Sequence, residues 1–187
     1  MRTRSAWFAL LVLLVVPGTG RSDFVAFATL TGDGESNSTG VGSGVVTYIS
    51  AKGELIVSLA FSGLESPTTV PPGVPGAAHI HFGLPGVEGP ILFPFLNFPT
   101  GVTSGSYSAI VTAADLMPDP TAGINTFAEA VTAIEDGETY FNIHTEKFPG
   151  GEIRGQILVP EPAGLTLLAL GLGGVLAFTR ARRRRAA

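Results

Sequence analysis

The chain has three histidines, and they fall in two short segments with the alternating pattern of a β-strand. His79 and His81 stand two residues apart in the segment AHIHF, and His144 ends the segment YFNIH. Neutral imidazoles bind Zn²⁺ and Cu²⁺ well, and a His-x-His pair on a strand is a common chelate. The alternative is a polar network without a metal, in which the imidazoles bond to backbone groups and Arg154 pairs with Glu152 or another nearby carboxylate.

The strands that carry these residues predict where the side chains lie. Side chains two positions apart on a strand share one face of the sheet. If Ile80 and Phe82 face the core, both His79 and His81 face away from it. The same alternation applied to residues 139–144 and 152–159 predicts one exposed polar patch on three neighbouring strands. Its members would be the three histidines together with Asn142, Glu152, Arg154 and Gln156.

Arg154 bears on the choice between a metal site and a network. A guanidinium beside the imidazoles would repel a divalent ion and would suit an anion or a carboxylate instead. The expectation for cofactors is therefore none, with Zn or Cu on His79, His81 and His144 as the alternative.

The rest of the chain between its two ends reads as an all-β domain. Runs of β-branched and aromatic residues separated by Gly, Pro and Ser clusters predict strands at 24–30, 44–50, 54–61, 78–82, 91–95, 105–112, 139–144 and 152–159. One helix is predicted over residues 125–135, with Asn125 as its N-cap and Gly137 after its end. Its apolar face would comprise Phe127, Ala130, Val131 and Ile134. These elements predict an antiparallel, Greek-key-like β-sandwich with one short helix.

The N-terminus has the three parts of a secretory signal peptide. Arg2 and Arg4 precede an apolar run over residues 6–16, and small, helix-breaking residues follow up to Gly20. We expect residues 1–20 to form a signal helix that signal peptidase removes after Gly20. An uncleaved anchor is the alternative, but the run is short compared with the ~20 residues that a membrane span needs.

The C-terminus, residues 159–187, also has three parts. The motif Pro160-Glu161-Pro162 precedes an uncharged stretch at 163–179, and the chain ends in an arginine cluster that includes Arg182, Arg183, Arg184 and Arg185. The stretch predicts a membrane helix whose arginines stay in the cytoplasm. This order resembles the PEP-CTERM sorting signal of Gram-negative bacteria. The resemblance implies an exosortase as processing enzyme, cleavage near the motif, and transfer from the membrane to the outer surface or extracellular matrix. A plain single-span anchor is the alternative.

Composition narrows the function classes. The chain has 187 residues and no cysteine, so disulfides and thiol chemistry are excluded. Between Phe24 and Leu158 there are three basic and thirteen acidic residues, which argues against nucleic acid as a partner. No nucleophile elbow, phosphate loop or paired-carboxylate site is visible, so we do not expect an enzyme.

Four segments of the domain at 21–158 together resemble the CHRD domain, a module named from chordin. They are AHIHFG, GPI, YFNIHT and FPGGEIRGQI. The resemblance implies an extracellular β module with no established catalytic mechanism. The sequence is also faintly similar to copper–zinc superoxide dismutase, but three histidines are too few for that family's two metal sites, and there is no disulfide.

The expected function is therefore an exported structural or interaction module of the cell surface or extracellular matrix, with exopolysaccharide as a possible partner. The alternative is a metal-binding or redox surface module that uses the three histidines.

Overall fold

The computed structural model describes residues 21–32 and 36–160. The predicted signal helix, the predicted membrane helix, Glu161, Pro162 and the arginine cluster lie outside these residues. The strands are β1 (Phe24–Thr31), β2 (Val41–Ile49), β3 (Glu54–Ser62), β4 (Ala78–Phe82), β5 (Ile91–Pro94), β6 (Gly105–Val111), β7 (Thr139–Ile143) and β8 (Ile153–Gln156). A 3₁₀ turn, η1 (Ala113–Asp115), and one α-helix, α1 (Phe127–Glu135), complete the described elements. No helix among these residues is long and apolar enough to cross a membrane.

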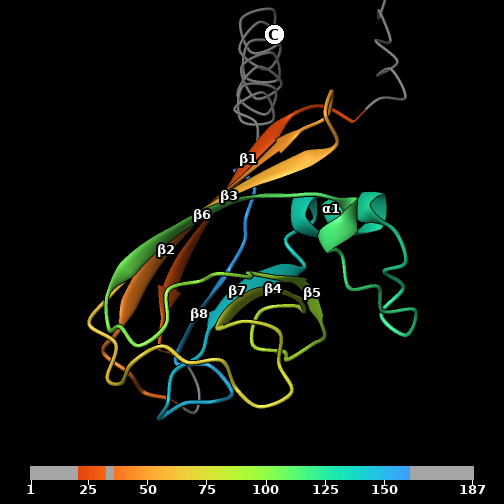
Figure 1. Ribbon diagram of the computed structural model, residues 1–187. Coiled ribbons are helices and arrows are strands. Elements are labelled where there is room, and N and C mark those ends of the chain that lie inside the picture. The colour runs from red at the N-terminus through yellow and green to blue at the C-terminus, as the bar shows by residue number, and fades with distance from the viewer. Residues whose placement is uncertain (1–20, 33–35, 161–187) are drawn as a thin grey trace, which may run out of the picture.

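All eight strands belong to one antiparallel sheet, in the order β5-β4-β7-β8-β1-β2-β3-β6 (Figure 1). The chain crosses between the two halves of this sheet three times, after β3, after β5 and after β6. The expected all-β, antiparallel fold with one helix is confirmed. Within residues 21–32 and 36–160 the strands do not form the two separate sheets of a sandwich, because β1 pairs with β8 and joins the halves into one sheet.

The core lies between the two halves, which curl towards each other until the sheet is nearly closed. The ring of Phe141 on β7 packs so tightly over Gly44 on β2 that a Cβ there would lie 2.4 Å from it. At the open edges, the rings of Phe95 and Tyr107 are 5.2 Å apart, and the Tyr107 hydroxyl donates to the Leu96 carbonyl at 3.1 Å. Side chains from both halves therefore fill one hydrophobic core.

The helix α1 begins one residue later than the sequence predicts. Thr126, not Asn125, is the N-cap: its hydroxyl accepts from the backbone of Glu129, whose carboxylate accepts from Thr126 in return. This capping box satisfies backbone donors that the helix itself leaves unpaired. Val131 and Ile134 are fully buried against the core, whereas Phe127 is only partly buried.

The last strand is shorter than predicted, because the chain changes partner at its end. Ile157 still donates to the carbonyl of Thr139, the first residue of β7, but the next residue, Leu158, exchanges two hydrogen bonds of 2.9 Å with Phe27 of β1. The described chain ends two residues later, at Pro160.

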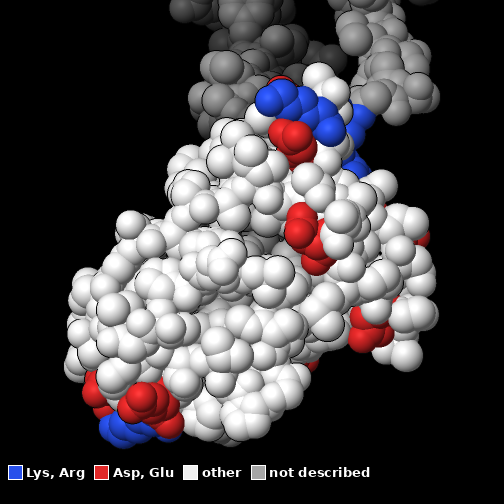
Figure 2. All heavy atoms as spheres, in the orientation of Figure 1, with Lys and Arg blue, Asp and Glu red and all other residues white. Residues whose placement is uncertain are grey.

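Charged side chains cover little of the surface that Figure 2 shows. The basic groups visible on that face lie next to acidic ones, and much of the area between carries neither sign. Among the described residues, basic and acidic side chains form ion pairs between Arg21 and Glu135, between Lys52 and Glu54, and between Lys147 and Glu65. This face therefore has no extended basic patch.

Candidate metal centre

Strand pairing brings the three histidines to one place on the sheet. β4 lies beside β7, with His79 opposite Asn142 and His81 opposite Tyr140. His144 follows β7 directly, and its backbone N–H donates to the Ala77 carbonyl at 2.8 Å. Arg154 on β8 is opposite Asn142 on the other side. The alternation predicted that these residues share one face, and the pairing confirms it.

The same face is not exposed, however, and this part of the prediction is wrong. His79 is 0% exposed, His81 8% and His144 4%. The segments 71–77, 83–90 and 145–152 fold back over the outer side of β4 and β7, and each contributes one backbone carbonyl to one histidine. The expected surface patch is therefore an interior cluster roofed by three loops.

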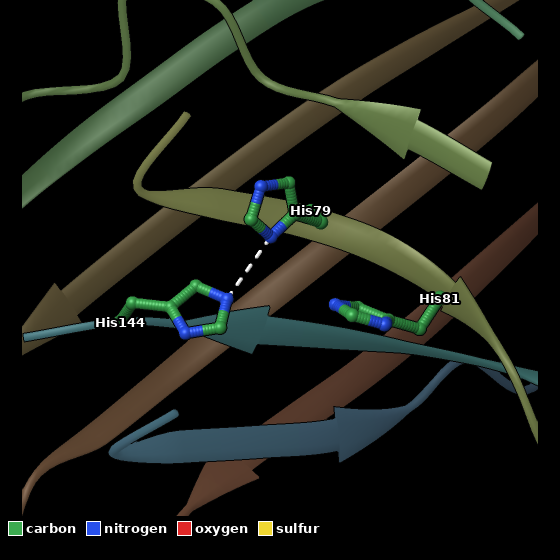
Figure 3. A group of neighbouring side chains, drawn as sticks. All are labelled: His79, His81 and His144. Atoms are coloured by element: carbon green, nitrogen blue, oxygen red, sulfur yellow. Dashed lines mark hydrogen bonds between the residues drawn. The ribbon is translucent and has the colours of Figure 1, made fainter. Parts of the chain in front are cut away.

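The three rings face a common point (Figure 3). His79 and His81 extend from the same strand, and His144 approaches from the end of β7. The distance between His79 Nδ1 and His144 Nε2 is 3.0 Å. One nitrogen from each ring can be chosen so that all three lie within 4.8 Å of one another. This spacing is close enough for a single ion to contact all three, since imidazole ligands bind at ~2 Å.

The loop carbonyls determine which nitrogen of each ring carries the hydrogen. A carbonyl oxygen can only accept, so the ring nitrogen facing it must carry the hydrogen. His79 Nε2 faces the Pro75 carbonyl at 2.9 Å, His81 Nδ1 faces the Gly89 carbonyl at 2.9 Å, and His144 Nδ1 faces the Pro149 carbonyl at 2.8 Å. In neutral rings the opposite nitrogens then carry lone pairs. These are His79 Nδ1, His81 Nε2 and His144 Nε2.

Burial keeps the rings neutral. Removal from water lowers the pKa of His79 to about 3, with further lowering from the neighbouring His144 and His81. Burial likewise lowers the pKa of His144 to about 4, and it lowers the pKa of His81. Near neutral pH the 3.0 Å contact between His79 and His144 therefore joins two lone pairs with no proton between them.

Two further side chains flank the cluster. The ring of Tyr140 stacks on that of His81, with centroids 5.0 Å apart and 12° between the planes. The guanidinium of Arg154 lies 5.8 Å from the centroid of the same Tyr140 ring. Arg154 thus lies beside the cluster, as predicted, and its positive charge contributes to the lowered pKa of His81, while the exposed Glu88 acts in the opposite direction.

The remaining predicted neighbours fasten loops rather than face the imidazoles. Asn142 donates to the Gly150 carbonyl at 2.9 Å, and Gln156 donates to the carbonyls of Gly83 and Gly137. The carboxylate of Glu152 is buried and accepts from Ser38, Thr145 and the backbone of Glu65. These residues hold the surrounding loops in place and do not belong to the cluster of three imidazole rings.

Sequence reasoning missed the three carbonyls of Pro75, Gly89 and Pro149. Their signal in the sequence is the Pro- and Gly-rich composition of the segments next to the histidine strands. Gly89 illustrates the constraint, since a Cβ there would lie 1.8 Å from the Phe82 carbonyl oxygen. Only a residue without a side chain lets this loop lie against β4.

The family model of the CHRD domain matches residues 26–157, which include every strand of the described fold except the first two residues of β1. The chain belongs to the CHRD domain family. CHRD domains are modules of the extracellular type, and the match includes all three histidines and the three roofing loops. Neither the curated proteins nor the solved structures that were searched gave a match.

Proposed function

We propose that this chain is an exported CHRD-domain module that binds one transition-metal ion, zinc or copper, through His79, His81 and His144. One observation carries the proposal: each imidazole donates its N–H outward to a loop carbonyl and directs its lone pair inward. Histidines that bind metals are held in the same manner, because a hydrogen bond on the outer nitrogen fixes the tautomer and the ring orientation.

A polar network without a metal explains the cluster less well. His81 Nε2 is buried and has no hydrogen-bond partner among the described residues. A buried polar atom without a partner costs ~1–3 kcal/mol. The contact between His79 and His144 adds lone-pair repulsion at 3.0 Å. A cation bound to the three nitrogens would remove both costs at once.

The place of action that we propose is the cell surface or extracellular matrix. The extracellular character of the family, the signal-peptide pattern at residues 1–20 and the resemblance of the C-terminus to a PEP-CTERM signal support export and sorting. We propose that the exported module is embedded in exopolysaccharide. Signal peptidase and exosortase are the proposed processing enzymes. We propose a binding or structural role rather than catalysis, because the ligand atoms are buried beneath the loops.

The test removes one ligand nitrogen at a time and keeps the bond to the loop. An Asn amide can replace Nδ1 of histidine, and a Gln amide can replace Nε2. The variants His79→Gln, His81→Asn and His144→Asn therefore retain a donor to each carbonyl and lose only the inward lone pair. We expect the full chain, purified in mild detergent without a polyhistidine tag, to bind about one equivalent of Zn²⁺ or copper by calorimetry and metal analysis. Each variant should bind at least ~100-fold more weakly.

Folding of the variants is checked separately, by near-ultraviolet circular dichroism of the metal-free proteins. Because His81 Nε2 has no partner to lose, His81→Asn should keep the metal-free stability closest to that of the wild type. Equal binding by the wild type and a well-folded His81→Asn variant would mean that the cluster is a network and not a metal site.

A further inference from the structure

We propose that the three-histidine site selects monovalent copper, Cu⁺, over Zn²⁺ and Cu²⁺. This inference rests on the proposed function, since it names the ion for the same site. It follows from four features of the cluster: the charge of its ligands, its burial, the number of donors within reach, and the spacing of the ligand nitrogens.

The ligands bring no negative charge to the ion. All three are imidazoles, and among the described residues no Asp or Glu joins their group. Glu88 and Arg154 both act on His81, but their charges are opposite, and Glu88 belongs to an exposed part of its loop. A bound ion therefore keeps its full formal charge.

Burial makes that charge decisive. The cost of moving an ion from water into a medium of low polarity rises with the square of its charge, so a divalent ion costs about four times as much as a monovalent ion of similar size. His79 is fully buried, and Nε2 of His81 is almost without solvent contact. Many sites that hold divalent ions offset this cost with carboxylate or thiolate ligands.

The number of donors leads to the same ion. Zinc in proteins is almost always four-coordinate, so three histidines leave one position for water or another ligand. Two polar side chains on β7, beside the histidine strand, have partners of their own: Asn142 donates to the Gly150 carbonyl, and the Tyr140 hydroxyl accepts from the backbone of Gly89. Cu⁺ has a filled d shell and accepts two or three ligands, so the histidines alone can complete its coordination.

The nitrogen positions suit a three-coordinate ion. With bonds of ~2.0 Å, a trigonal ion requires ligand nitrogens ~3.5 Å apart. His79 Nδ1 and His144 Nε2 are at 3.0 Å, and the set of three spans at most 4.8 Å.

The experiment measures three affinities of the full chain, purified in mild detergent without a polyhistidine tag. Cu⁺ is titrated without oxygen against the chromogenic chelator bicinchoninate, and Zn²⁺ and Cu²⁺ are titrated against chelators of known affinity. We expect Cu⁺ to bind tighter than either divalent ion by ~100-fold or more. Binding of Zn²⁺ or Cu²⁺ as tightly as Cu⁺ would overturn the selection but leave the metal site intact. Failure to bind any of the three ions would instead overturn the proposed function.

A matched pair of variants tests the charge argument directly. Arg154→Met removes the positive charge beside Tyr140 and keeps a long side chain, whereas Arg154→Lys keeps the charge. We expect Arg154→Met to raise the affinity for Zn²⁺ and Cu²⁺ several-fold more than that for Cu⁺, and Arg154→Lys to leave the ratio near that of the wild type. An equal change for all three ions in Arg154→Met would contradict the proposal.

Discussion

Thr145 donates a hydrogen bond of 2.7 Å to the buried carboxylate of Glu152 and so closes the loop between them. This loop carries Pro149, whose carbonyl orients His144. The other carboxylate oxygen of Glu152 accepts from the Ser38 hydroxyl and from the backbone of Glu65, both at 2.6 Å. One side chain thus fastens three segments of the chain, and the three donors Ser38, Thr145 and the Glu65 backbone are uncharged.

The first prediction concerns this carboxylate. Glu152→Gln places an amide hydrogen against groups that themselves donate, so we expect a loss of about 2–3 kcal/mol in the free energy of unfolding. Denaturant titration of the metal-free protein measures this loss of stability. The affinity for the metal should also fall, because the loop that carries the Pro149 carbonyl becomes less well fixed. Glu146→Gln, an exposed change in the same loop, is the matched control and should alter the free energy of unfolding by less than ~0.5 kcal/mol.

The second prediction is a loss of stability of the metal-free protein in mild acid. The pKa values of His79 and His144 are lowered to about 3 and about 4 in the folded chain, compared with 6.5 without burial. Below pH 6.5 the unfolded chain therefore takes up protons that the folded chain does not. Stability is fully present above this pH and falls by up to about 1.4 kcal/mol per pH unit for each histidine.

The window for this measurement lies between pH 6.5 and about pH 5.5. At lower pH the carboxyl groups of Asp23, Asp119 and Glu129, whose pKa values are lowered in the folded chain, also begin to reduce stability as the pH approaches their ordinary values of 3.8 and 4.5. Denaturant midpoints at several pH values should show the decline, and His79→Gln should reduce its slope. A wild-type stability that stays level across this window would contradict the neutral, buried state of the rings.

A third prediction compares two glycines in the roofing loops. Gly89→Ala places a methyl group 1.8 Å from the Phe82 carbonyl oxygen, so the loop must move and carry its carbonyl away from His81. We expect metal affinity to fall ~10-fold or more, as it does when outer partners of metal-binding histidines are lost. Gly150→Ala meets no atom within 4 Å and should bind metal like the wild type. Equal affinities of the two variants would show that the Gly89 loop does not orient His81.

The helix provides a fourth prediction. Ile134 is fully buried, so Ile134→Ala should cost about 2–5 kcal/mol in the free energy of unfolding. Phe127 is only partly buried and contacts Phe93 edge-on, with centroids 5.9 Å apart. Phe127→Ala should therefore cost less than Ile134→Ala, and denaturant titration of both variants gives the order. The reverse order would mean that the helix packs through its first turn.

Strand alternation predicted much of this architecture. Ile80, Phe141 and Ile153 can fill one core only if His79, Asn142 and Arg154 face the other way, and the observed register agrees. Alternation does not predict whether that second face is exposed to solvent. The segments that cover it are loops, whose sequences have no regular hydrophobic periodicity. The carbonyls of Pro75, Gly89 and Pro149 reach the rings through tertiary packing, which no local pattern in the sequence describes. For the same reason, the joining of β1 to β8 into one sheet was not predicted.

The fifth prediction concerns the C-terminal tail. If Pro160-Glu161-Pro162 is a sorting motif, replacement of Pro160 and Pro162 by Ala should retain the full-length chain in the membrane fraction. Mass spectrometry of the mature wild-type protein should then find a product that ends near this motif and lacks the arginine cluster. A mature protein that still ends at Ala187 would contradict processing at this site.

The bonded pair of Phe27 and Leu158 has a mechanical consequence. β1 and the segment after β8 run antiparallel, so the chain enters and leaves the domain at the same end of the junction that joins the two halves of the sheet (Figure 1). Tension applied between the two chain ends would peel this junction open from Leu158 one bonded pair at a time, instead of shearing all its hydrogen bonds together. Among the described residues, the Thr31–Arg154 pair and the Phe27–Leu158 bridge are the only paired positions along this junction. The domain would therefore yield here at low force, while the eight-pair contact of β1 with β2 still holds.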